Sequence, residues 1–230
     1  AGLVTVGTDK ENIPALHSHL PEAMAFDLDD KQLLEQQLKK ASVVLIGSGL
    51  VDDERGEELL HTVFHHLEQN QTLILDGGAL SILAKTKMKF PKVHLVLTPH
   101  QREWQVLSGL DLTSQGTEET GKVLKRFPSG TILVQKGPAT RIWQAGQADC
   151  YQLSVGGPYQ ATGGMGDTLA GMVAGFAGQF PQASLYERVT VATHLHSAIA
   201  QELAEDNYVV LPTMISQQIP AFMKNIQKDT

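Results

Sequence analysis

The sequence predicts an α/β fold in which a mostly parallel sheet lies between two layers of helices. Short runs of apolar, β-branched residues alternate along the chain with segments of helical periodicity. The runs are apolar throughout, which is typical of strands buried on both faces of a parallel sheet. Because such strands are joined by crossover helices, helices are expected on both faces. No repeat or linker interrupts the pattern, so residues 1–230 are expected to form a single domain.

The predicted strands are short. An apolar, β-branched run that ends at Gly47 indicates a buried strand, and similar runs end just before Asp76 and Pro99. A turn at Gly146 separates two edge or hairpin strands. The expected strands are residues 3–7, 42–46, 72–75, 93–97, 131–134, 141–143 and 151–153.

The predicted helices place apolar residues on one side. In residues 52–68, for example, Leu60, Val63 and Leu67 fall on the same face. The remainder of residues 11–28 is mixed, and no strand is predicted there. The expected helices are residues 13–20, 31–39, 52–68, 80–85, 103–107, 118–126, 168–179, 184–204 and 212–226.

The composition excludes several classes of protein. Hydrophobic residues make up 42% of the chain, and the formal net charge is −7 with no basic cluster, which argues against nucleic-acid binding. The longest apolar run, residues 170–178, is too short and too rich in glycine to span a bilayer, and no signal peptide is visible. The single cysteine, Cys150, permits no internal disulfide, so we expect a cytoplasmic protein with no membrane partner.

The most informative stretch is the glycine loop, residues 161–167, in which Gly163, Gly164 and Gly166 precede Asp167. Glycines offer no side chain to the core but let the backbone turn tightly and approach a ligand. A predicted helix follows, and the free N–H groups of a helix N-terminus bind anions, phosphate above all. A structural turn with an acid that caps the helix explains this motif equally well when it is taken alone.

Polar residues also follow the predicted strands. Residues 47–49 (Gly-Ser-Gly), Asp76, His100 with Glu103, and Lys136 with Gly137 each come at or shortly after a strand end. In open α/β sheets, ligands bind beyond the carboxyl ends of the strands. Glycines also make turns, and Asp76 and Pro99 could simply start helices. Together these residues indicate one shared crevice that holds phosphate.

Three other possible motifs do not match known nucleotide-binding or metal-binding patterns. Residues 116–123 resemble a P-loop, but the final Ser or Thr is replaced by Val123 and no strand precedes them. Residues 47–49 lack the third glycine of the dinucleotide fingerprint. His61 and His65 are spaced as metal ligands on a helix, but no third ligand of a known motif accompanies them, so a solvated face is expected.

Five segments in order resemble the ADP-dependent NAD(P)H-hydrate dehydratase family of the ribokinase-like superfamily. They are residues 47–50, 76–80, 97–103, 136–137 and 161–171. Gly-Gly-x-Gly-Asp alone marks the superfamily, and Thr-Pro-His-x-x-Glu narrows it to the dehydratases. The sequence departs from the family pattern at residues 77–78, at residues 101–102 and at Met165, without loss of a reacting group.

The resemblance implies a repair reaction. The family phosphorylates the C6 hydroxyl of hydrated NADH or NADPH (NADHX or NADPHX) with ADP, or with ATP in eukaryotic relatives. Phosphate then leaves and restores the reduced cofactor. The implied cofactors are ADP and Mg²⁺, and the implied assembly is a homo-oligomer. Rival hypotheses are a ribokinase-like kinase of the hydroxymethylpyrimidine, hydroxyethylthiazole or pyridoxal type, and a nucleotide-binding relative without catalysis.

The resemblance also implies residue roles. Asp167 would be the catalytic base, and Gly49 and His100 would contact the hydrate with it. Glu103 would organise Mg²⁺ or its waters. The amides of Gly163, Gly164 and Gly166 would form the anion hole. The nucleotide would be held by Lys136, Gly137, Pro138, Ala139, Thr140 and Gly166.

The start of the chain differs from the family. It opens at Ala1 without Met, in a run typical of a strand already under way, so we expect residues upstream. The family has an earlier strand, a glycine-rich turn and a helix that contribute to the hydrate site. This first strand–helix unit is absent from the sequence, and a molecule that lacks it is expected to have an incomplete site.

Overall fold

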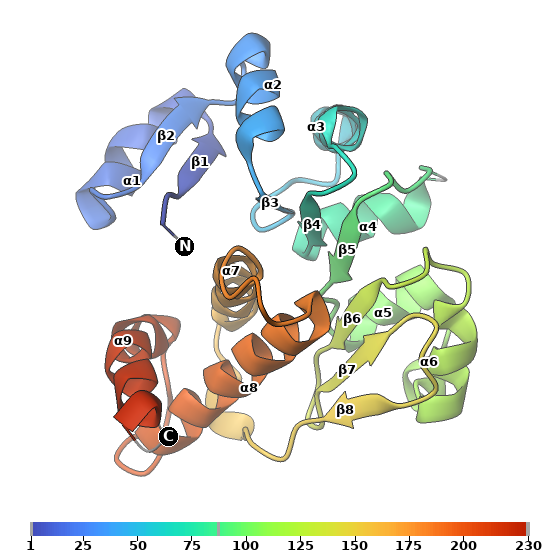
Figure 1. Cartoon of the computed structure of the whole chain (residues 1–230), viewed down its shortest axis with the longest axis vertical. Helices are drawn as coiled ribbons and strands as arrows, with labels where there is room; N and C mark the ends of the chain where they lie inside the picture. Colours follow the sequence, from blue (N-terminus) through green and yellow to red (C-terminus); the bar gives the residue numbers. More distant parts are fainter. Residues whose placement is uncertain (1, 87, 229–230) are drawn as a thin grey trace.

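A computed structural model describes residues 2–86 and 88–228 (Figure 1). The strands are β1 (Thr5–Thr8), β2 (Met24–Asp27), β3 (Val43–Ile46), β4 (Thr72–Leu75), β5 (His94–Leu97), β6 (Ile132–Gln135), β7 (Arg141–Gln144) and β8 (Cys150–Gln152). The helices are α1 (Ile13–His19), α2 (Lys31–Lys40), α3 (Glu54–His66), α4 (Gly77–Lys85), α5 (Gln101–Ser108), α6 (Thr117–Leu124), α7 (Met165–Ala177), α8 (Leu185–Leu203) and α9 (Pro212–Lys228). Short 3₁₀ turns lie at Lys10–Asn12, Leu112–Ser114 and Pro158–Gln160.

The main sheet has the strand order β3-β4-β5-β6-β7-β8. Neighbouring strands from β3 to β6 are parallel, whereas β6, β7 and β8 pair in antiparallel fashion. The register sets Leu73 beside Leu95 and Leu75 beside Leu97. Because parallel neighbours end at the same edge, the segments that follow β3, β4, β5 and β6 meet there. The predicted, mostly parallel sheet is confirmed.

The sheet is buried on both faces, since alternate residues of a strand point to opposite sides. Ile74 and Val96 belong to the core cluster formed with α7, α8 and α9. Leu73, Leu75 and Leu95 belong to a second cluster, formed with α2 to α6. Figure 1 shows α7, α8 and α9 in orange and red, apart from the cyan and green helices α3 to α6. The expected three layers are therefore present.

The first two strands form a separate, two-stranded parallel sheet in which Thr5 lies beside Met24. Strand β2 was not predicted, because its short apolar run contains no β-branched residue and its extended form depends on pairing with β1. Arg55 of α3 holds this unit, with Nη2 2.6 Å from Asp9 Oδ1 and 3.1 Å from Asp29 Oδ1.

None of the helices within residues 2–86 and 88–228 combines the length and the apolar character needed to cross a membrane.

Candidate active site

The segments that follow three neighbouring strands lie along one edge of the sheet. Asp76 follows β4, Thr98 follows β5, and Lys136 follows β6. The exits of β5 and β6 are joined directly, because Lys136 N donates to Pro99 O at 2.9 Å. His100 and Lys136 also form an isolated parallel bridge. The predicted grouping of polar residues at the strand ends is thus what the strand order produces.

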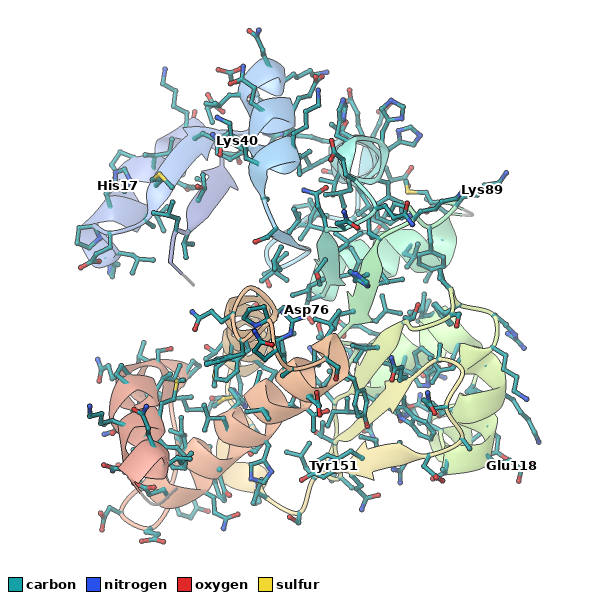
Figure 2. All side chains as sticks on the ribbon, in the orientation of Figure 1. His17, Lys40, Asp76, Lys89, Glu118 and Tyr151 are labelled. Carbon is teal, nitrogen blue, oxygen red and sulfur yellow. The ribbon has the colours of Figure 1, made fainter. Side chains whose placement is uncertain are left out.

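A buried ion pair forms the centre of this edge. Lys136 Nζ donates to Asp76 Oδ1 at 2.8 Å, and Thr98 Oγ1 donates to the same oxygen at 2.7 Å. Asp76 is 3% exposed and Thr98 is fully buried, while the Lys136 side chain is 17% exposed. Figure 2 labels Asp76 near the middle of the molecule, beside α7. Sequence reasoning placed Asp76 at a strand end but did not pair it with Lys136.

The glycine loop leads directly into α7. Gly164, at φ +80°, is the N-cap residue, and the helix begins at Met165, three residues before the predicted start. A helix start inside a glycine-rich run escaped prediction because glycine disfavours helix interiors, although first-turn residues need no helical partner for their N–H groups. The alternative that Asp167 caps the helix is wrong, because Gly164 occupies the N-cap position.

The first turn of α7 presents free N–H groups beside Lys136. Within the described part of the chain, the N–H groups of Gly163, Gly164, Gly166 and Asp167 have no hydrogen-bond acceptor. A Cβ built on Gly166 would lie 3.2 Å from Lys136 Nζ. The side chain of Asp167, the next residue, is exposed. Oriented amides, an ammonium group and an accessible carboxylate thus gather where a phosphoryl group and a hydroxyl could meet.

The turn after β3 packs closely on the start of α4. A Cβ built on Gly47, whose φ is +130°, would lie 1.7 Å from Asp76 O, and one on Gly78 would lie 1.9 Å from Leu50 O. Gly78 N also donates to Gly47 O at 3.0 Å. Gly49 differs, because a Cβ there would meet no atom within 4 Å. Gly47 and Gly78 are therefore required by close packing, whereas Gly49 is exposed and open to a ligand.

His100 and Glu103 start α5 as a capping box. His100 Nδ1 accepts from the N–H groups of Arg102 and Glu103, both at 3.1 Å, and Glu103 Oε2 accepts from His100 N at 2.7 Å. Glu103 Oε1 lies 3.6 Å from His100 Nε2. His100 is thus the N-cap residue of α5. Its ring is still half-exposed, so Nε2 can reach a ligand as well.

A cleft of about 350 Å³ lies next to Lys136. Among the residues that line it are Gln101, Gln115, Arg141 and residues 136–139. Thr140 closes the turn at its rim, since its Oγ1 accepts from Gly137 N at 3.3 Å and donates to Gly137 O at 3.1 Å. The predicted nucleotide segment therefore borders a cavity, and sequence reasoning did not foresee the glutamines and the arginine beside it.

His196, on the inward side of α8, is a further polar residue that sequence reasoning missed. It is 3% exposed, its Nδ1 lies 3.5 Å from Gln160 Nε2, and its buried Nε2 has no hydrogen-bond partner among the described residues. Burial lowers the pKa of His196 to about 4; contact with the Met165 backbone opposes this shift and the charge of Lys136 adds to it. A neutral imidazole therefore lies behind the first turn of α7.

The residues do not build a dedicated metal site. Residues 2–86 and 88–228 contain no group of three His, Cys, Asp or Glu side chains placed to share an ion. Both oxygens of Glu103 face His100, as described above, and its role in organising Mg²⁺ or its waters stays a prediction. His61 and His65 are exposed on α3, as expected.

Comparison with known proteins places the chain in a family. A family model described as NAD(P)H-hydrate dehydratase matches residues 1–221. The chain belongs to the NAD(P)H-hydrate dehydratase family. It is 70% identical over 226 residues to the ADP-dependent (S)-NAD(P)H-hydrate dehydratase of Streptococcus pneumoniae (strain ATCC BAA-255 / R6), an alignment that covers 98% of this chain and 78% of the relative.

Solved structures related to this member of the NAD(P)H-hydrate dehydratase family share its fold. A ribokinase-like superfamily protein from Enterococcus faecalis V583 superposes with a TM-score of 0.91 at 40% identity, covering 98% of this chain and 78% of the other. The ADP/ATP-dependent NAD(P)H-hydrate dehydratase of Bacillus subtilis, co-crystallised with ATP/Mg²⁺ and soaked with CoA, superposes with a TM-score of 0.81 at 26% identity, covering 97% and 81%. The predicted family and the ribokinase-like fold are confirmed. The roles of individual residues stay predictions.

Proposed function

We propose that this protein is an ADP-dependent (S)-NAD(P)H-hydrate dehydratase that repairs hydrated NADH and NADPH. Family membership and the names of the relatives support the reaction. The observation that carries the assignment of the site is the first turn of α7, where free amides precede the exposed Asp167 and Gly166 lies beside Lys136, a residue that lines the cleft.

ADP occupies the cleft beside residues 136–140 in this proposal, with its terminal phosphate at the glycine loop. The amides of Gly163, Gly164 and Gly166 cradle the transferring phosphoryl group, as the N-terminus of a helix does for phosphate in general. Gly49 and His100 lie at the exits of two other strands along the same edge and contact the hydrate. Gly49 is open, and the side chain of His100 is half-exposed.

Asp167 accepts the proton of the C6 hydroxyl while the oxygen of that hydroxyl attacks the terminal phosphorus of ADP. The bond from that phosphorus to the bridging oxygen breaks, so AMP leaves and the hydrate carries a phosphate at C6. Phosphoryl transfer needs chiefly positioning and stabilisation of charge, which amides and an ammonium group supply. A base in this position contributes about 10²–10⁴-fold.

Elimination then restores the cofactor. The lone pair of the ring nitrogen expels inorganic phosphate from C6, and loss of a proton from C5 forms the ring double bond of NADH or NADPH. The steps consume one ADP and release AMP and phosphate. This stage draws on the electronics of the substrate ring and requires little of the protein beyond the same anion hole.

Magnesium would accompany the nucleotide in this proposal and would neutralise charge on its phosphates, with Glu103 organising the ion or its waters. We carry the homo-oligomer, the cytoplasmic location and the absence of a nucleic-acid partner forward as predictions from the sequence.

The test is to incubate the purified protein with (6S)-NADHX and ADP and to follow the absorbance of reduced nicotinamide together with AMP and phosphate. Recovery of NADH with matching amounts of AMP and phosphate supports the proposal. A stable phosphorylated product from a hydroxymethylpyrimidine, hydroxyethylthiazole or pyridoxal substrate, with no recovery of NADH, assigns the protein to the kinases. Binding of ADP without turnover of any of these substrates assigns it to the nucleotide-binding relatives.

A further inference from the structure

We propose that Asp76 is a positioning residue that holds Lys136 Nζ at the glycine loop, where the ammonium group meets the transferred phosphate of ADP. The inference rests on the proposed function, because it assigns an end of ADP to this part of the site. It concerns a carboxylate that the family resemblance left without a role.

Burial makes the Asp76–Lys136 contact directional. Asp76 is 3% exposed and is fixed by Thr98 Oγ1 at 2.7 Å and by Lys136 Nζ at 2.8 Å. A free lysine samples many rotamers at its four-carbon stem, and a partner of this kind confines it to one. The lysine therefore enters the site already oriented, and the nucleotide does not have to order it.

Stability alone does not account for the pair. Replacing a buried ion pair by apolar side chains of similar volume is often neutral or stabilising, so such a pair is weak grounds for a structural role. Apolar residues of similar volume at 76 and 136 could therefore fill the same space without burying a charge. Unlike apolar side chains, the charged pair places an ammonium group at a fixed position on the open edge of the sheet.

The direction of the ammonium group identifies what it meets. Among the described residues, its hydrogen-bond acceptor is Asp76, which leaves two of its three N–H donors available. The absent side chain of Gly166 leaves room beside it, because a Cβ there would lie 3.2 Å from Nζ. The free amide groups of the first turn of α7 include the N–H group of Gly166 itself. An anion bound by those amides therefore lies within reach of Lys136, and in ADP that anion is the terminal phosphate.

The experiment compares the affinities of ADP and AMP, measured by calorimetry without the hydrate, for the wild type and Asp76→Asn. The two nucleotides differ only by the phosphate that is transferred. We expect Asp76→Asn to reduce the preference for ADP over AMP by about tenfold, the lower end for a hydrogen bond to a charged group, and to leave AMP affinity within about twofold. The turnover number with (6S)-NADHX should fall by at least the same factor, because transferred charge is stabilised at the same point.

Two further variants serve as a second test and as a control. Gly166→Ala introduces a Cβ against Lys136 Nζ in a helical turn that tolerates alanine, so it should reduce the ADP preference even if Asp76→Asn fails to fold. Glu118→Gln removes the acid of an exposed pair with Lys122, 2.6 Å apart on α6, and should leave the preference unchanged. Equal losses of ADP and AMP affinity in Asp76→Asn, or no preference for ADP in the wild type, would overturn the inference. Failure of the proposed reaction shows up separately, as absent NADH recovery with the ADP preference intact.

Discussion

Two acid–base clusters join distant parts of this chain, and they differ in how far solvent reaches them. Asp76 and Lys136, 60 residues apart, pair at 2.8 Å with side chains that are 4% and 17% exposed. Arg55 bridges Asp9 and Asp29 at 2.6 and 3.1 Å, but these three side chains are 58%, 44% and 79% exposed. The distances are similar, so geometry alone does not distinguish the clusters.

The difference teaches what burial adds to an ion pair. Water and salt screen the exposed Arg55 cluster, so it docks the β1–β2 unit against α3 without a large contribution to stability. The buried pair lies in a low-dielectric environment where an unpaired charge is costly and a charge fixed in place acts strongly on a neighbouring anion. We therefore expect changes around Asp76 to affect activity and folding far more than changes around Arg55.

The largest effect is expected at Asp167, the proposed base in the first turn of α7. Asp167→Asn should lower the turnover number by about 10²–10⁴-fold, because it removes the base, while ADP affinity changes little. Turnover is followed by NADH recovery and affinity by calorimetry. Asp9→Asn, a matched change in the exposed cluster, should leave turnover unchanged. Normal turnover in Asp167→Asn would exclude Asp167 as the base.

Gly47 tests how tightly the backbone around Asp76 is packed. Gly47→Ala should lower the free energy of unfolding by about 3 kcal/mol, because φ is +130° and the new Cβ would clash with Asp76 O. Gly49→Ala, at φ +74° with open space around it, should cost about 1 kcal/mol. Urea titration measures both. Equal costs would show that the close approach to Asp76 imposes no extra penalty.

His196 makes the region behind α7 sensitive to acid. Its pKa is lowered from 6.5 to about 4, so between these values the unfolded chain binds a proton that the folded chain does not. As pH falls through that window, stability should drop by up to about 3 kcal/mol from this group. In urea titrations at several pH values, the free energy of unfolding of His196→Gln should fall less steeply with decreasing pH than that of the wild type. His17→Gln, at an exposed position, should follow the wild type. Parallel profiles for His196→Gln and the wild type would contradict the assignment.

The smallest effect is expected at Arg55. Arg55→Ala should leave NADH recovery within about twofold of the wild type, because solvent-exposed pairs contribute little. Added salt should weaken the wild-type contact in the same direction, so the two proteins should become more alike in urea titrations at high ionic strength. A large loss of activity in Arg55→Ala would mean that the β1–β2 unit supports the site.

Sequence reasoning succeeded where local patterns were strong. The bounds of β4, Thr72–Leu75, match the prediction, because a strand buried on both faces is a nearly continuous run of apolar and β-branched residues. Helix α8 was predicted to within a residue at each end for a similar reason, since its apolar spacing runs over many turns. Strand β2 was missed because its extended form depends on β1, 19 positions earlier in the register.

What the sequence by itself determined was the alternation of strands and helices, the phosphate-type glycine loop and the polar residues after each strand, because these follow from local periodicity and residue chemistry. Which of those polar residues touch was decided by the tertiary structure alone. Asp76 meets Lys136 because the strand order β4-β5-β6 brings their exits together, and His196 becomes a buried neutral base because α8 packs behind α7. Contacts of that kind join residues far apart in the chain, so no local pattern contains them.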